Sequence, residues 1–124
     1  MSEKQLHQSV CDFIKYKYPH VLLNVDLSGQ NMSPMIGAQL KRLRSNSGYP
    51  DIVIYKKKGN FGACFIELKV EGYKLYNKQG ELKTDHLKNQ EECMRRLREE
   101  GYYATFAIGI DHAIAVVETY MNLI

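Results

Sequence analysis

The sequence predicts an α/β fold in which a mixed central β-sheet is flanked by α-helices. Apolar residues recur at helical spacing near both ends of the chain and again between residues 85 and 100, and short apolar runs of strand length separate these segments. The predicted order is helix, strand, long loop, strand, strand, helix, strand, helix. With 124 residues, of which 44% are hydrophobic and 25% charged, the chain suits one compact domain over residues 1–124.

The N-terminal segment predicts a helix over residues 2–18. Ser2 and Gln5 have the spacing of a capping box, and an apolar stripe follows at helical intervals, formed by Leu6, Val10, Phe13 and Ile14. Pro19 ends this helix. His20–Leu27 then has the composition of a first strand.

Residues 28–50 contain three glycines and two prolines and predict an irregular loop, with a short basic helix near Ala38–Arg44. Such a long loop in a small domain is more often functional than idle. Three segments follow that predict a hairpin, with Asp51–Tyr55 as one strand, the KKKGN sequence of residues 56–60 as the turn and Ala63–Val70 as the returning strand.

The C-terminal half begins with a second loop, rich in glycine, lysine and asparagine, which extends to about Lys83. The sequence then predicts a helix over Asp85–Glu100 that Gly101 ends. Tyr103–Ile110 predicts a strand. Asp111 is expected to cap a final helix that ends at Leu123.

The composition excludes several classes of protein. No apolar run reaches the length of a membrane span and the N-terminus has no hydrophobic signal region, so we expect a cytoplasmic protein. The three cysteines (Cys11, Cys64 and Cys93) are odd in number and far apart, which argues against a disulfide framework or a zinc site and favours small core residues. The net charge of +3 names no partner, but residues 35–60 hold six basic residues around one acid, Asp51, which suits a polyanionic substrate.

Charged residues inside the predicted core strands are the main indication of function. Residues two apart share a strand face, so Phe65, Glu67 and Lys69 point one way and the apolar residues between them point the other. A strand with one solvated face would also explain this alternation. Asp51, however, begins the strand that the hairpin pairs with this one, and we therefore expect Asp51 and Glu67 to converge.

Two helical residues are also directed inward by their spacing. Gln90 lies three residues after Leu87, within the apolar stripe of its helix, and Glu3 falls within the stripe of the first helix. A core glutamine satisfied by a neighbour, and an acid favoured by the helix dipole, would explain these positions structurally. Together with Asp51 and Glu67 they make four inward-directed polar residues, and this coincidence favours a shared site.

The chemistry available to such a site is specific. Carboxylates held close together repel one another and need a cation to remain ionised. Oxygen ligands suit magnesium or manganese, and these metals commonly contact substrate phosphates as well. Such a metal polarises a phosphodiester and lowers the pKa of a bound water. Lys69, one side chain along from Glu67, is placed to position that water, so the residues predict a phosphodiesterase site at one edge of the sheet.

The same residues resemble a known nuclease signature. Pro50-Asp51 followed by Glu67-Leu68-Lys69 is similar to the PD-(D/E)xK motif. The wider pattern is more selective than this motif. It consists of Glu3 in an opening amphipathic helix, GYPD (residues 48–51), FIELK (residues 65–69), Gln90 and Gly101-Tyr102. Together they resemble the VRR-NUC domain, the virus-type replication-repair nuclease family, over nearly the whole chain, as a stand-alone minimal member.

This resemblance implies a restriction-endonuclease-like core, a Mg²⁺ or Mn²⁺ cofactor and hydrolysis of DNA phosphodiesters. The implied catalytic residues are Asp51, Glu67, Lys69 and Gln90, and the implied metal ligands are Asp51, Glu67, the Leu68 carbonyl and, directly or through water, Glu3. Gln90 would support Lys69 or the attacking water. Family members act in replication, recombination and repair, often on branched or flapped DNA. Small members are widespread in phages and similar in size to dimeric junction-resolving enzymes, which implies a homodimer in a bacterial cell or a phage-infected host.

Positive charge outside the metal site supplies further candidates. The basic helix and the hairpin turn suit phosphate contacts that position DNA without reading its sequence, although a solvated surface explains the lysines of the turn equally well. Tyr49, next to Asp51, is a candidate to pack on a sugar or base, or a half-buried aromatic residue that closes the loop. Of the histidines, only His86 lies near enough to Gln90 to be considered for substrate contact. The nucleic-acid-binding candidates are Tyr49, Lys41, Arg42, Arg44, Lys56, Lys57 and Lys58.

The sequence therefore favours a metal-dependent, structure-specific DNA endonuclease that acts on branched, junction (including Holliday junction) or flap DNA. Two other functions stay open. A non-catalytic DNA-binding module could retain the fold, but it would have no reason to hold converging carboxylates near phosphate. A sequence-specific restriction-type endonuclease would need a base-reading region for which the chain has little room.

Overall fold

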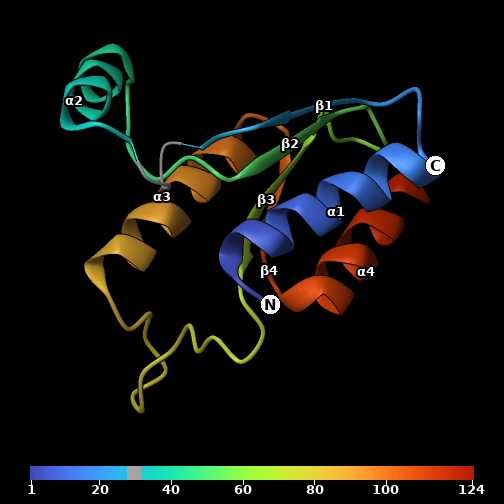
Figure 1. Ribbon diagram of the computed structural model, residues 1–124. Helices are drawn as coiled ribbons and strands as arrows, with labels where there is room; N and C mark the ends of the chain where they lie inside the picture. The colour runs from blue at the N-terminus through green and yellow to red at the C-terminus, as the bar shows by residue number, and fades with distance from the viewer. Residues whose placement is uncertain (28–31) are drawn as a thin grey trace.

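The computed structural model of the protein describes residues 1–27 and 32–124, and these residues confirm the predicted α/β class and order of elements (Figure 1). The elements are α1 (Glu3–Lys17), β1 (Leu22–Val25), α2 (Pro34–Leu43), β2 (Ile52–Tyr55), β3 (Cys64–Lys69), α3 (Asp85–Glu99), β4 (Tyr103–Ile108) and α4 (Gly109–Met121).

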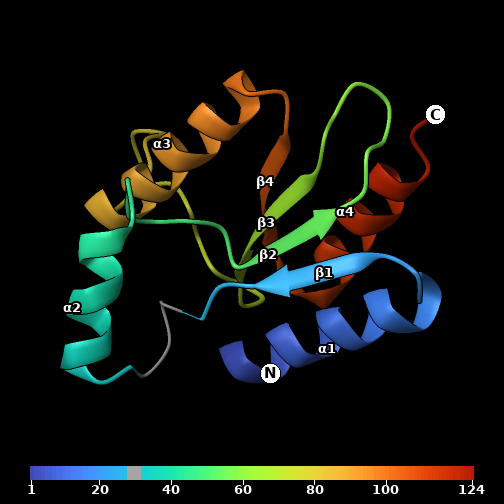
Figure 2. The ribbon, with the colours of Figure 1, turned by 90° about the horizontal axis from the view of Figure 1, so that it is seen from above.

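The strands form one mixed sheet in the order β1-β2-β3-β4. β1 and β2 pair antiparallel, as do β2 and β3, whereas β3 and β4 pair parallel. Helices α1 and α4 run side by side along one face of the sheet, and α3 packs on β4 from the other side (Figures 1 and 2). Helix α2 stands away from the sheet and has no buried residue.

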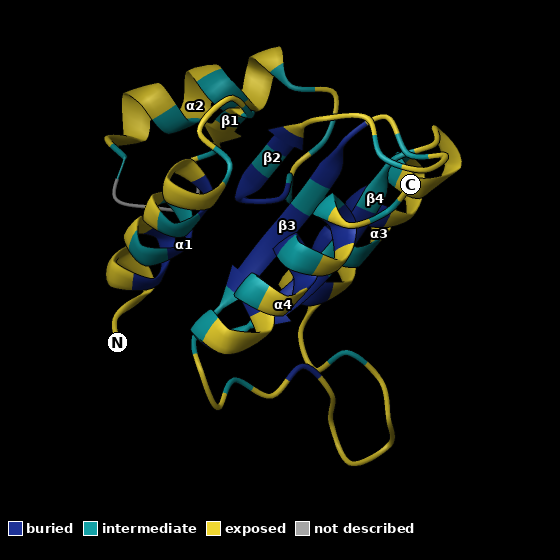
Figure 3. Ribbon diagram, turned by 90° about the vertical axis from the view of Figure 1, so that its right-hand side faces the viewer, coloured by how far each residue is buried: buried dark blue, intermediate teal, exposed yellow. Residues whose placement is uncertain are grey.

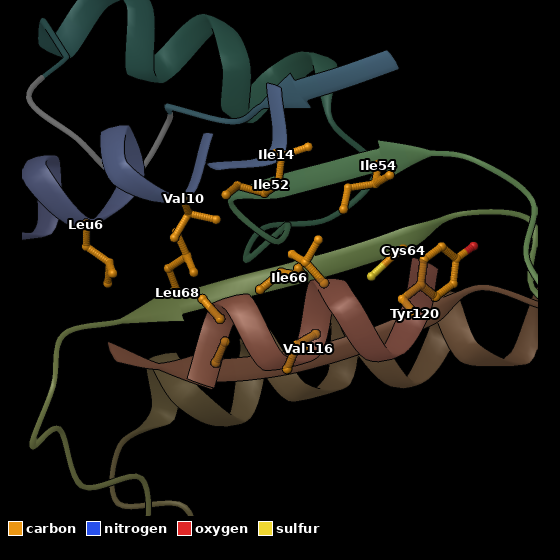
Figure 4. Packing of buried hydrophobic residues seen from close by; sticks show 13 residues of the cluster. Leu6, Val10, Ile14, Ile52, Ile54, Cys64, Ile66, Leu68, Val116 and Tyr120 are labelled. Atoms are coloured by element: carbon orange, nitrogen blue, oxygen red, sulfur yellow. The ribbon is translucent and has the colours of Figure 1, made fainter. Parts of the chain in front are cut away.

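Apolar residues bury both faces of β3. Ile66 and Leu68 pack in the larger core between the sheet and helices α1 and α4 (Figure 4). Phe65 packs in a second, smaller core against Leu87 of α3. Glu67, on the same face as Phe65, is also buried, and β3 is largely dark blue in Figure 3. The alternative of a strand with one solvated face is therefore wrong.

The hairpin between β2 and β3 is confirmed. Ile52 lies opposite Ile66 and Ile54 opposite Cys64, and a bridge between Lys58 and Phe61 closes the turn. This antiparallel register fixes which residues meet where β2 begins, and it therefore determines how the site is assembled.

Helix α1 begins as the capping box predicts. The Ser2 hydroxyl accepts the Gln5 N–H at 3.1 Å, and the Gln5 side chain accepts the Ser2 N–H at 2.8 Å. Leu6 is buried as expected. The burial predicted for Glu3 is wrong, because this residue is exposed at the rim of a cavity rather than packed on the sheet.

The helix predicted near Ala38–Arg44 begins earlier, at Pro34. Ser33 precedes it as the N-cap, and its hydroxyl accepts the Ile36 N–H at 3.3 Å. Proline favours this first helical position because its missing N–H is not needed there. Residues 28–31 of the predicted loop lie outside the described residues.

A further boundary error is at the start of the final helix. We expected the last strand to reach Ile110 and Asp111 to cap the helix, but β4 ends at Ile108 and α4 begins at Gly109, without a side-chain cap. The φ angle of Gly109 is +83°, a value that glycine adopts without strain and that turns the chain directly from strand to helix. Asp111 consequently lies in the first turn of α4.

Two expectations from composition concern the cysteines and membrane-spanning segments. Cys64 and Cys93 are buried and Cys11 is half-buried, as expected of small core residues. No helix in the described parts of the chain has both the length and the apolar character needed to cross a membrane.

Tyr120 links α4 to the hairpin turn and gives a test of the fold that leaves the site untouched. The side chain is fully buried and its hydroxyl donates to the Lys56 carbonyl at 2.5 Å. We expect Tyr120→Phe to lower the free energy of unfolding by about 1 kcal/mol, because a part-buried hydrogen bond is lost. Urea denaturation measures the change. A variant as stable as the wild type would show that this hydrogen bond contributes nothing net.

Candidate active site

Residues from four elements line one open cavity of about 490 Å³. Asp51 lies just before β2, Glu67 and Lys69 lie on β3, and Gln90 lies on α3. Glu3 at the start of α1 lines the same cavity, as do residues of α2 on the opposite wall. The structure therefore brings together the five polar side chains that the sequence analysis selected.

The hairpin register places the two carboxylates side by side. Ile52 pairs with Ile66, so one further step along the antiparallel ladder sets Asp51 opposite Glu67. The expected convergence of these two residues is confirmed. Asp51 Oδ2 also accepts the Leu68 N–H at 2.8 Å, which fixes the carboxylate against the end of β3.

Both carboxylates are withdrawn from solvent. Asp51 is 9% exposed and Glu67 is 4% exposed. Burial raises the pKa of Glu67 above its ordinary value, a hydrogen bond with Asp51 and the charge of that residue raise it further, and Lys69 lowers it. The pair therefore resists carrying two negative charges unless a cation compensates them.

Lys69 supplies one positive charge at this position. Its Nζ lies 3.9 Å from Glu67 Oε2, and its side chain is 12% exposed. The ammonium group also lies 5.2 Å from the centre of the Tyr73 ring, a cation–π contact. Tyr73 belongs to the loop between β3 and α3, so this loop borders the site.

Gln90 is buried in the cavity wall, as its place in the helical stripe predicted. It is 5% exposed, and its Oε1 has no hydrogen-bond partner among the described residues. Its Nε2 lies 3.2 Å from Nε2 of His86, a contact in which the amide donates to the unprotonated ring nitrogen. The structural explanation of a satisfied core glutamine is therefore incomplete, since one polar atom is left for a ligand, a water or Lys69.

Gly48 in the GYPD segment allows the loop to pack on Gln90. Its φ is +79°, and a Cβ there would stand 3.2 Å from the Gln90 backbone. Both features restrict the position to glycine. The segment before Asp51 thus packs closely on the α3 backbone at Asn89 and Gln90.

The donor set fits a divalent cation with oxygen ligands and open positions for water. Asp51 and Glu67 supply two carboxylates. The Leu68 carbonyl projects from the same edge of β3 as the Leu68 N–H that Asp51 binds, because both groups of a strand residue point to one side. Among the described residues no group of three histidine, cysteine or acidic side chains converges on one position, so Glu3 stands apart from the carboxylate pair.

The basic candidates separate into two groups. Lys41 and Arg44 line the cavity, but Arg44 donates to Asp26 at 2.8 Å and stacks on the Tyr49 ring at 5.4 Å, which holds this arginine in the wall. The hairpin turn with Lys56, Lys57 and Lys58 lies at the other end of β2, roughly 20 Å from Asp51 for an extended chain of this length. Arg42 is exposed on α2 and does not line the cavity.

Sequence reasoning missed two polar residues near the carboxylates. His7 is buried, and its Nε2 lies 3.7 Å from Asp51 Oδ2. Asp26 continues the pairing of β1 with β2, its N–H donating to the Asp51 carbonyl at 2.7 Å, and its side chain lines the cavity. A signal existed for His7, which lies one helical turn after Glu3 and next to buried Leu6.

A comparison with solved structures identifies the fold family. A VRR_NUC domain protein matches with 26% sequence identity and a TM-score of 0.71, and the match covers 99% of this chain and 90% of that protein. The chain is similar in fold to this VRR_NUC domain protein. The resemblance noted from the sequence and its restriction-endonuclease-like fold are thereby confirmed. No protein-family model matches the sequence, and a search of curated proteins likewise gives no match.

The buried Glu67 predicts a pH dependence of stability. Its pKa is raised in the folded state, so the folded protein holds a proton that the unfolded chain releases, and stability falls as the pH rises above the ordinary value of 4.5. In the metal-free Glu67→Gln variant, the free energy of unfolding should no longer fall with pH in this way. For one proton the slope of that fall is at most about 1.4 kcal/mol per pH unit. Urea denaturation with chelator from about pH 5 to about pH 8 measures the difference.

Glu92→Gln provides the control for this measurement. Glu92 is an exposed acid of α3, and a hydrogen bond from Arg95 lowers its pKa. The contribution of Glu92 to the free energy of unfolding is therefore constant above pH 4.5 and is lost only as the pH falls below that value. Identical slopes for wild type and Glu67→Gln would contradict the raised pKa of Glu67.

Proposed function

We propose that this protein is a VRR-NUC nuclease, a metal-dependent deoxyribonuclease that hydrolyses phosphodiester bonds. The observation that carries the proposal is the buried pairing of Asp51 with Glu67 at an open cavity, beside Lys69 on the same strand. The name of the structural relative, a VRR_NUC domain protein, supports the nuclease class. Nucleic acid is accordingly the proposed substrate.

The proposed cation site consists of Asp51, Glu67 and the Leu68 carbonyl, with Glu3 at the rim in reach through water. Mg²⁺ or Mn²⁺ suits this oxygen-rich, partly open set of ligands. When bound, the ion supplies Lewis-acid polarisation of a phosphate and a more acidic water. The carboxylates contribute by remaining ionised beside the phosphate, which they would otherwise repel.

Lys69 and Gln90 are the proposed catalytic partners. The Lys69 ammonium group is held between Glu67 and the Tyr73 ring, so its position is restricted before substrate binds. From there it orients the attacking water and offsets negative charge that develops on the phosphate. The open Oε1 of Gln90 accepts a hydrogen bond from that water or from Lys69.

The surroundings of the cavity suit a DNA backbone. Lys41 on α2 lines the cavity opposite the carboxylates, and Tyr49 stands beside Asp51 with its hydroxyl 2.8 Å from the Ser45 hydroxyl. We propose that Lys41 contacts a phosphate close to the cleaved bond. The lysines of the hairpin turn are too distant for that and would contact DNA further along a branched or bent substrate.

Substrate shape and assembly belong to the same proposal. The preferred substrates are branched, flapped or four-way-junction DNA, in replication, recombination or repair, and the acting species is a homodimer. A two-fold pair of these small domains would place two active sites on opposed strands of a junction. A sequence-specific restriction-type enzyme ranks lower, and so does a DNA-binding module without catalysis, because buried paired carboxylates weaken binding to phosphate when no cation is present.

Variants of Asp51 and Lys69 separate cation binding from catalysis. We expect Asp51→Asn to lose both Mn²⁺ binding and cleavage. Lys69→Ala should keep Mn²⁺ binding, while its kcat falls by about 100- to 1,000-fold because charge stabilisation is lost. Calorimetric titration with Mn²⁺ and cleavage of labelled DNA measure the two effects, with exposed Lys15→Ala on α1 as the control. Unfolding of both variants would favour a structural role for this buried network.

A panel of DNA substrates tests the activity and its preference. Labelled duplex, single-stranded, flapped and four-way-junction DNA are incubated with Mg²⁺, with Mn²⁺ or with chelator, and Glu67→Ala is run in parallel. We expect metal-dependent cleavage that is strongest on branched DNA and absent from Glu67→Ala. Binding without cleavage under every condition would favour the DNA-binding module, and a fixed cleavage sequence would favour the restriction-type enzyme.

A further inference from the structure

His7 is a buried titratable residue to which neither the motif nor the proposed mechanism gives a role. It lies on the face of α1 that packs against the sheet, between buried Leu6 and Val10, and is 6% exposed. A histidine among apolar neighbours requires a polar contact to offset its loss of water. The position of that contact indicates its purpose.

The His7 ring faces the Asp51 carboxylate. Its Nε2 lies 3.7 Å from Asp51 Oδ2, about half an ångström beyond the usual range of a hydrogen bond. The same Oδ2 accepts the Leu68 N–H at 2.8 Å. One oxygen of Asp51 thus receives the contacts from both β3 and α1, while the carboxylate also hydrogen-bonds Glu67.

These contacts restrain Asp51 from two independent elements. Leu68 holds the carboxylate from the strand, and His7 approaches it from the helix that also carries Glu3. Asp51 precedes β2 and follows the long loop, so its own backbone is less restrained than that of Glu67 within β3. A carboxylate at the end of a loop benefits from a second contact, because a cation ligand must be oriented to be effective.

We propose that His7 is a positioning residue, which holds the Asp51 carboxylate in the orientation that the cation site requires. The inference rests on the cation site proposed above and assigns to it a residue outside the ligand set. His7 acts through Nε2–H, directed at Asp51 Oδ2. It contacts neither substrate nor reacting atoms in this role.

Mn²⁺ binding in the absence of DNA tests this role. The probe is Mn²⁺ alone, titrated at one fixed pH and followed by loss of the free-ion electron paramagnetic resonance signal. Removing a residue that orients a metal ligand commonly weakens metal affinity by about 10- to 100-fold, and we expect His7→Leu to do so. His7→Gln, whose amide nitrogen reaches a position similar to Nε2, should restore the affinity to within about threefold of wild type.

A kinetic readout separates positioning from chemistry. In His7→Leu the Mn²⁺ concentration that gives half-maximal DNA cleavage should rise in step with the dissociation constant. The kcat at saturating Mn²⁺ should recover to near the wild-type value, because Lys69 and Gln90 are unchanged. His7→Asn, whose amide is too short to reach Asp51, should behave like His7→Leu and serves if the leucine variant does not fold.

Leu6→Ala is the matched control for loosened packing of α1. It removes a buried apolar side chain next to His7 that can form no hydrogen bond or ion pair with Asp51, and we expect its Mn²⁺ affinity to equal that of wild type at temperatures where it is folded. Unchanged affinity in His7→Leu, equal weakening in His7→Gln, or equal weakening in Leu6→Ala would overturn the role of His7 alone. Failure of the wild-type protein to bind Mn²⁺ would overturn the cation site and the role of His7 with it.

Discussion

The site depends on how the antiparallel ladder between β2 and β3 ends. Continuing the register by two residues beyond Ile52 and Ile66 sets Pro50 opposite Leu68. Proline has no N–H, so it supplies no backbone donor for the Leu68 carbonyl. The Leu68 N–H also leaves the ladder and donates to the Asp51 carboxylate, at 2.8 Å. A break in backbone pairing thus fixes one acidic side chain against the strand that carries the other.

This arrangement has an energetic cost that indicates its purpose. Two carboxylates at 9% and 4% exposure lose most of their hydration, and the neighbouring ammonium of Lys69 lies 3.9 Å from Glu67. With Glu67 protonated, Lys69 balances the charge of Asp51, and ionisation of both acids leaves one negative charge in excess. A structural network would gain more from apolar residues of similar size. The proposed cation would compensate this excess and allow both acids to ionise.

Much of the fold and part of the site could be predicted because both follow from local periodicity. Alternation along β3 and the hairpin were enough to bring Asp51 to Glu67, and the apolar stripe of α3 was enough to bury Gln90. The same reasoning failed for Glu3, because helical spacing gives the direction of a side chain but not whether the sheet extends beneath it. His7 and Asp26 were missed because their importance comes from contacts with Asp51 across different elements. Spacing along the sequence does not show which elements lie side by side.

The comparison with known structures fits this dependence on backbone register. The features that build the site are few, and several are properties of the main chain, such as the missing N–H of Pro50, the Leu68 amide and the positive φ of Gly48. Side chains elsewhere need only keep the sheet and its helices in place, and many apolar combinations do so. Sequence comparison with family models then finds no match, whereas the fold still superposes at a TM-score of 0.71 with 26% identity. A fold held by strand register and interchangeable apolar packing is expected to persist through sequence change of this extent.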